Sequence, residues 1–110
     1  RLVGEARAMG LAMLGDKLAA EDAAAWGLIW RAVDDAAFAA EVDALAQKLA
    51  AAPTRALAAI KDTLRASARN TLEAQLDVER DVQRELGTSA DYREGVAAFL
   101  AKRAPQFRGR

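Results

Sequence analysis

Cysteine and histidine are both absent from the 110 residues. Without cysteine the chain can form neither a disulfide nor a thiolate nucleophile. Without histidine it lacks the commonest metal ligand and the commonest base at neutral pH. Any catalysis performed by these residues alone would therefore depend on carboxylates, lysine or tyrosine.

An excess of charge of either sign is also missing, since 16 basic residues balance 16 acidic ones. No net field attracts nucleic acid or an anionic membrane, and aromatic residues make up only 5% of the chain. Apolar runs are far shorter than the roughly 20 residues that span a bilayer, and no signal-like segment opens the chain. We expect a soluble, cytoplasmic protein without nucleic-acid or membrane partners.

Because Arg1 leads directly into an apolar-periodic segment, we also expect this chain to be part of a longer protein, although a processed start or a trimmed chain would look the same.

Alanine, by contrast, is abundant, with 29 of the 110 residues, and leucine and charged residues fill much of the rest. These are strong helix formers, so the composition predicts an all-α fold. The apolar spacing and the capping residues predict five or six helices, which run to Gly15, over 20–26, from Asp34 or Asp35 to Pro53, over 53–68, from Asn70 to Gly87, and from Ser89 to Pro105. The run 28–33 is the one β-like segment and is too short to found a sheet.

Most of the expected helices carry an apolar face that should point inward. The clearest ones belong to the last four helices: Phe38, Val42, Leu45 and Leu49; Leu57, Ile60 and Leu64; Leu72, Leu76, Val82 and Leu86; Tyr92, Val96 and Phe99. Together these faces are wider than a domain of 110 residues needs. Asn70 and Glu73 have the spacing of a capping box at the start of the fifth helix.

Three carboxylates could carry chemistry. Asp91 and Glu94 are three residues apart on one helical face, a spacing that could place both near one substrate atom. They could equally be partners of the helix dipole at its first turn. Glu79 lies near the inner face of its helix, where a carboxylate needs a partner, either an arginine in a structural salt bridge or a ligand.

Aromatic and basic groups allow similar alternatives. An aromatic pocket could form from Trp26, Trp30 and Phe38, although such side chains beside an alanine-rich core are usually packing residues. The basic C-terminal end would suit a phosphate-bearing ligand, or could simply be solvated: Lys102, Arg103, Arg108 and Arg110. No glycine-rich phosphate loop, metal-ligand cluster or nucleophile motif is present.

Two segments resemble signatures of the crotonase superfamily, the enoyl-CoA hydratases and isomerases. They are residues 15–29 (GDKLAAEDAAAWGLI) and residues 89–107 (SADYREGVAAFLAKRAPQF). Residues 27–31 and 76–81 are similar to the branch that isomerises the ring epoxide of phenylacetyl-CoA, with a generic enoyl-CoA hydratase as the nearest alternative. The likeness extends along essentially the whole chain.

The resemblance implies that residues 1–110 form one C-terminal helical domain, which covers a spiral catalytic core and builds a trimer or hexamer. It implies an acyl-CoA thioester as substrate, no further cofactor or metal, and catalytic groups that all lie outside this chain. Phe99 and Lys102 match the positions that approach the adenine and phosphates of coenzyme A, with Arg103 as a helper. The competing hypothesis is a stand-alone helical interaction module without catalysis.

Overall fold

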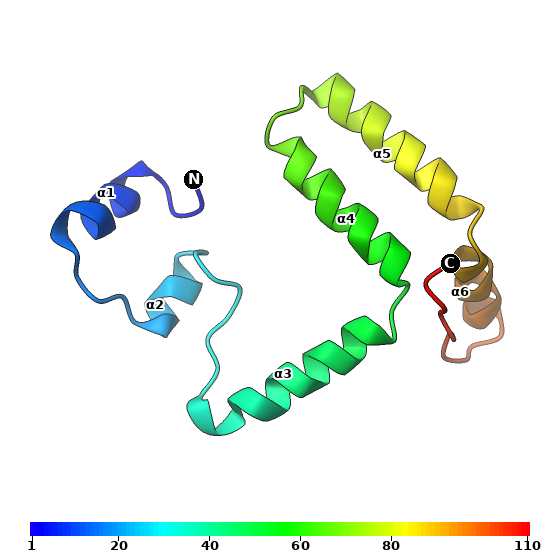
Figure 1. The fold of residues 1–110 in the computed structure, drawn as a ribbon, viewed down its shortest axis with the longest axis horizontal. Coiled ribbons are helices and arrows are strands. Elements are labelled where there is room, and N and C mark those ends of the chain that lie inside the picture. The colour runs from blue at the N-terminus through cyan, green and yellow to red at the C-terminus, as the bar shows by residue number, and fades with distance from the viewer. The chain divides into compact units, whose positions relative to one another are not determined.

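The computed structural model describes all residues 1–110 and contains six helices and no strand (Figure 1). The helices are α1 (Glu5–Leu14), α2 (Ala20–Ala25), α3 (Asp35–Ala50), α4 (Thr54–Ser67), α5 (Leu72–Gly87) and α6 (Ala90–Leu100). The all-α expectation is confirmed, and the segment 28–33 forms bends and irregular backbone. None of the helices is long and apolar enough to cross a membrane.

Several helix ends lie where the sequence places them. Gly15 adopts the left-handed conformation after α1, with φ of 70°, and its amide donates to the Leu11 carbonyl at 3.2 Å. Gly27 has φ of 76° just after α2. Ser89 caps α6, because its hydroxyl oxygen accepts from the Tyr92 amide at 3.1 Å. The sequence predicts these helix ends correctly because each depends only on residues within one helical turn.

Other ends differ from the prediction. The last helix was expected to run to Pro105, but α6 ends at Leu100, and the remaining differences are of one residue or of the type of contact. Thr71, rather than Asn70, caps α5 by accepting from the Ala74 amide at 3.3 Å. The predicted capping box is therefore wrong, and the Asn70 side chain instead donates to Gln75 at 3.0 Å. Pro53 precedes α4 rather than forming its first residue.

The start of α3 also differs from the prediction. The Ala37 amide donates to the backbone carbonyl of Asp34 at 2.9 Å, whereas a side-chain cap from Asp34 or Asp35 was expected. A backbone carbonyl in this position closes the first turn without using a carboxylate.

The chain divides into two compact units, Arg1–Val42 and Asp43–Arg110. In the first unit, the guanidinium of Arg7 lies 5.1 Å from the ring centre of Trp26. The guanidinium of Arg31 lies 5.0 Å from the ring of Trp30 and also pairs with Glu41 at 2.7 Å. Cation–π stacking of this kind stabilises exposed indole rings.

The large aromatic residues of this unit do not form a buried core, although the sequence predicts that they are packing residues. Trp30 and Phe38 are 76% and 58% exposed. Trp26 is half-buried, at the C-terminal end of α2. Large rings at these exposures are available for packing against something outside the unit.

The second unit is built on α4 and α5, which pack against each other as an antiparallel pair joined by a short turn (Figure 1). Near the turn, the Gln75 side chain donates to the Thr63 carbonyl at 3.5 Å and to Glu79 at 2.9 Å. At the opposite end of the pair, Arg55 forms an ion pair with Glu85. Glu79 itself is exposed, and the partner of its carboxylate is Gln75. The salt bridge to an arginine that the sequence predicts is therefore wrong.

Very little apolar surface is buried in either unit. Ala23 and Ala98 are the only buried apolar residues, and Ile60 and Leu64 on α4 are 54% and 66% exposed. The predicted apolar faces exist as helical stripes, but the chain itself leaves much of their area uncovered. Apolar surface of this extent makes these stripes candidate contact surfaces.

Candidate functional site

The best-defined polar cluster joins α6 to the last ten residues, which we call the C-terminal tail (residues 101–110). Asp91, in the first turn of α6, is only 6% exposed. Its two carboxylate oxygens accept from the backbone amides of Arg108 at 2.7 Å and Gly109 at 2.8 Å. Its own amide donates to the Arg110 carbonyl at 2.8 Å. Asp91 thereby holds the end of the tail against the start of α6.

Glu94, one turn further along α6, holds the beginning of the tail. Its carboxylate accepts two hydrogen bonds from the Arg103 guanidinium, at 2.6 and 2.9 Å, and one from the Gln106 amide at 2.8 Å. The bond to Arg103, followed by the bond from Gln106, lowers the pKa of Glu94 from 4.5 to about 2. The same ion pair raises the pKa of Arg103.

Asp91 and Glu94 therefore do not act as a free carboxylate pair. The three-residue spacing places both on one side of α6, as predicted, but the tail occupies their oxygens. Neither alternative considered from the sequence, a catalytic pair or helix-dipole partners, includes this role. The sequence contains one indication that the tail folds back onto α6: Pro105 and Gly109 are residues that favour a reversal of chain direction.

The turn after α6 contains Lys102 in an unusual backbone conformation. Lys102 has φ of 52° and is the only residue other than glycine with a positive φ. Its amide donates to the Phe99 carbonyl at 3.2 Å, and the Arg103 amide donates to the Ala98 carbonyl at 3.0 Å. These two bonds form a Schellman motif, in which glycine usually occupies the position of Lys102.

Phe99 and Lys102, the two residues predicted to contact coenzyme A, lie beside this turn. Phe99 is 82% exposed on the last turn of α6, and Lys102 is exposed directly after the helix. The Lys102 amide bonds to the Phe99 carbonyl, so the backbone places the two positions next to each other. Both side chains are accessible to a ligand, and their role remains a prediction.

The basic end of the chain is not one free cluster. The Arg103 guanidinium is engaged by Glu94, while the backbones of Arg108 and Arg110 are held at Asp91. The side chains of Lys102, Arg108 and Arg110 are exposed and take part in no ion pair. Lys102 is therefore the cation beside Phe99 that needs no rearrangement to meet an anion.

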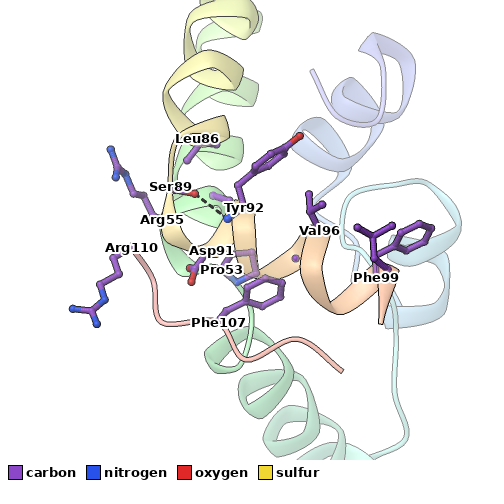
Figure 2. A pocket seen from close by; sticks show the side chains of 13 residues that line it. Pro53, Arg55, Leu86, Ser89, Asp91, Tyr92, Val96, Phe99, Phe107 and Arg110 are labelled. Carbon is purple, nitrogen blue, oxygen red and sulfur yellow. Dashed lines mark hydrogen bonds between the residues drawn. The ribbon is translucent and has the colours of Figure 1, made fainter. Parts of the chain in front are cut away.

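A mainly apolar pocket of about 470 Å³ opens between α4, α5, α6 and the tail (Figure 2). Phe107 packs beside α6, where a methyl group on Gly95 would lie 3.6 Å from its ring. Tyr92 and Val96 line the same pocket and are 57% and 44% exposed. The predicted inner face of the last helix is thus the wall of an open pocket rather than part of a closed core.

Metal-binding groups of three or more acidic, histidine or cysteine residues do not occur in the structure. The polar contacts described above are hydrogen bonds and ion pairs that fasten the tail. At the turn after α6, the exposed side chains of Lys102 and Phe99 form a combination suited to a ligand that carries both a phosphate and a planar ring.

Residues 1–110 match the family described as Enoyl-CoA hydratase/isomerase along their whole length. The chain is 56% identical over 110 residues to 1,2-epoxyphenylacetyl-CoA isomerase of Escherichia coli, covering 100% of this chain and 42% of that protein. It is 34% identical over 110 residues to 2,3-dehydroadipyl-CoA hydratase of the same organism, covering 100% of this chain and 43% of the hydratase.

A solved enoyl-CoA hydratase structure has the same fold as this chain. The crystal structure of an enoyl-CoA hydratase from Polaromonas sp. JS666 superimposes with a TM-score of 0.91 at 34% identity. The superposition covers 97% of this chain and 42% of the hydratase chain. The chain thus spans less than half the length of these relatives.

Proposed function

The chain belongs to the Enoyl-CoA hydratase/isomerase family, and from this premise we propose that it is the C-terminal helical domain of a longer acyl-CoA enzyme. Its coverage of 42% of the isomerase from Escherichia coli supports this proposal, because the remaining part of such a protein would hold the catalytic core. Residues 1–110 then act as one domain of the whole enzyme, and none of them is a catalytic residue.

The reaction that we propose for the whole enzyme is isomerisation of a ring-epoxide CoA ester, as the name of the 56% identical relative indicates. The observation that supports this choice is the 56% identity to that isomerase. A probable enoyl-CoA hydratase of Rhodobacter capsulatus is 53% identical over the same 110 residues, so hydration of an enoyl-CoA is the alternative reaction. In the family mechanism, two backbone amides stabilise the negative charge that forms on the thioester oxygen, and carboxylates move the proton. Asp91 and Glu94 do not serve as those carboxylates, because the tail occupies them.

We further propose that Phe99 and Lys102 contact the coenzyme A portion of the substrate. The exposed ring of Phe99 suits the adenine, and the exposed ammonium of Lys102 suits a phosphate. In this proposal the coenzyme A molecule is bound mainly by an adjacent subunit. No other cofactor takes part.

The exposed apolar faces support a role in assembly as a trimer or hexamer. Side chains such as Leu64 and Leu72, 66% and 71% exposed, would be covered by the catalytic core or by a neighbouring subunit. The stand-alone interaction module is less consistent with this exposure, because a self-sufficient domain would bury more of its apolar stripes. Released alone, the chain should therefore self-associate or bind a hydrophobic dye.

The activity is tested with the complete enzyme and with the isolated chain. We expect the complete enzyme to convert 1,2-epoxyphenylacetyl-CoA to its seven-membered oxepin isomer, and the isolated chain to be inactive. Hydration of a straight-chain enoyl-CoA without any epoxide isomerisation would instead identify a generic hydratase. Turnover by the isolated chain would contradict the proposed division between core and helical domain.

The ligand contact is tested by Lys102→Ala in the complete enzyme. Alanine pays a similar cost at positive φ, so the change mainly removes the ammonium group. Loss of one charge-assisted hydrogen bond should raise the KM for the acyl-CoA about tenfold and leave assembly unchanged. An unaltered KM would contradict the assignment.

A further inference from the structure

The backbone of Lys102 is held in a conformation that its side chain disfavours. Residues with a β-carbon rarely adopt a positive φ, because the β-carbon approaches the carbonyl oxygen too closely. Glycine would remove this conflict, yet lysine stands at the position, with φ of 52°. Such a conformation persists when the surrounding contacts fix it, and it then sets the direction in which the side chain leaves the backbone.

The contacts that fix this turn come from two sides. On the helix side, the amides of Lys102 and Arg103 donate to the carbonyls of Phe99 and Ala98. On the tail side, Glu94 binds the Arg103 guanidinium through both carboxylate oxygens and also accepts from the Gln106 amide. The Arg103 guanidinium donates in addition to the Ala104 carbonyl at 3.0 Å, which ties the turn to itself.

Glu94 is well placed to control the turn because it holds the backbone that follows Lys102 at two points. One partner, Arg103, directly follows Lys102, and the other, Gln106, lies four residues after Lys102. Glu94 is only partly exposed, with 24% of its side chain accessible, so water competes less with these bonds than at a fully exposed pair. Asp91, in contrast, holds the tail only at residues 108–110, further from the turn.

We propose that Glu94 is a positioning residue for coenzyme A binding, which acts by locking Arg103 and thereby the backbone of Lys102. This inference rests on the proposed contact between Lys102 and coenzyme A. Glu94 itself touches no ligand, and Arg103 serves the turn rather than a phosphate. The ion pair keeps the Lys102 backbone fixed where its amide bonds the Phe99 carbonyl, so the side chain has fewer directions to lose when the ligand binds.

The experiment compares two probes on the complete enzyme by calorimetric titration. Coenzyme A carries the adenine and the phosphates of the nucleotide, whereas pantetheine lacks that nucleotide. Lys102→Ala should weaken coenzyme A about tenfold and leave pantetheine unchanged. Glu94→Gln keeps the size of the side chain but loses the ion pair, and should weaken coenzyme A about threefold to tenfold with pantetheine again unchanged.

Steady-state kinetics and a double variant separate positioning from a general structural effect. Glu94→Gln should raise the KM of the acyl-CoA without changing kcat. Because Glu94 acts through Lys102, the variant carrying both Glu94→Gln and Lys102→Ala should bind coenzyme A as Lys102→Ala alone does. Asp77→Asn is the matched control, since it also removes a carboxylate from an arginine pair, at 2.7 Å from Arg80 on the exposed side of α5.

Each outcome decides between the two proposals. If Lys102→Ala leaves coenzyme A binding unchanged, the ligand contact itself is wrong. If Lys102→Ala weakens binding but Glu94→Gln does not, the contact stands and the positioning role is refuted. Losses that add in the double variant, or a loss of pantetheine binding in Glu94→Gln, also refute it. Should Glu94→Gln fail to assemble, Arg103→Lys keeps the charge but breaks the two-bond pairing, and a loss confined to coenzyme A is expected there as well.

Discussion

Replacing Asp91 with asparagine should release the end of the C-terminal tail. Asparagine has the same shape, but one of its two terminal groups is an N–H donor and would face the amide of Arg108 or Gly109, which are bonded at 2.7 and 2.8 Å. A hydrogen bond to a charged acceptor contributes about 1.5–3 kcal/mol. Losing one such bond, and weakening the other, should therefore destabilise the docked tail by about 2 kcal/mol, which is about a 30-fold rise in its open population.

Trypsin cleavage of the complete enzyme under native conditions measures this opening. Trypsin cuts after arginine, and the bonds that follow Arg103 and Arg108 lie within the tail. When opening and closing are faster than cleavage, the cleavage rate follows the open population. We expect cleavage after Arg108 to be about 30-fold faster in Asp91→Asn than in the parent protein. Mass spectrometry of the released peptides identifies the bond that is cut.

The control variant is again Asp77→Asn, whose side chain is 67% exposed in its pair with Arg80. An exposed ion pair contributes at most about 1 kcal/mol, and this one lies far along the sequence from the tail, so tail cleavage should stay within about twofold of the parent. Equal cleavage rates in Asp91→Asn and in this control would refute the reasoning, because the buried carboxylate would then not be what holds the tail.

The remaining predictions concern Glu94 and Gly109. Since folding lowers the pKa of Glu94 from 4.5 to about 2, its contribution to stability should be complete above about pH 4.5 and disappear as the pH falls toward 2. The difference in melting temperature between the parent and Glu94→Gln should therefore shrink over that range, and a constant difference would contradict the assigned ion pair. Gly109→Ala should speed tail cleavage about fivefold, because φ is +72° and the new methyl group would lie 2.5 Å from Thr54 Oγ1. Adding Thr54→Ala removes the clash but not the strain at positive φ, so the double variant should be cleaved at a rate between those of Gly109→Ala and the parent. If Gly109→Ala alone were cleaved as slowly as the parent, the prediction would be wrong, because the tail end would then accommodate the methyl group.

Features that depend on neighbours in the sequence could be predicted. The ends of α1 and α6 at Gly15 and Ser89 follow from one turn of backbone, and the structure confirms both. The cap of α5 was misplaced by one residue because Asn70 and Thr71 are both good capping residues. In the structure Thr71 caps the helix, while the Asn70 side chain donates to Gln75, in the next turn.

Contacts across longer separations could not be predicted in the same way. The bonds between Asp91 and residues 108–109 bridge 17 and 18 positions and depend on a chain reversal that no periodic pattern encodes. The positive φ of Lys102 gives no sequence signal either, since glycine is the usual residue there. Phe99 and Lys102 were selected only through the family resemblance.

The apolar faces show a different limit. Helical periodicity located residues such as Ile60 and Leu64 correctly on one stripe, but it cannot say what covers the stripe. Both side chains were expected to point into a core, but within this chain each is more than half exposed. Burial depends on all the protein that surrounds a helix, so a sequence that spans 42% of a relative can show the face without its partner.

The distribution of chromophores gives each unit its own optical signal. Both tryptophans, Trp26 and Trp30, belong to the first unit, where arginines stack on their rings, and Tyr92, the single tyrosine, belongs to the second. Indole emission from this chain therefore reports on the first unit alone, and phenol absorbance on the pocket beside α6. Followed together during chemical unfolding, the two signals would show directly whether the units lose structure in one cooperative transition or in two.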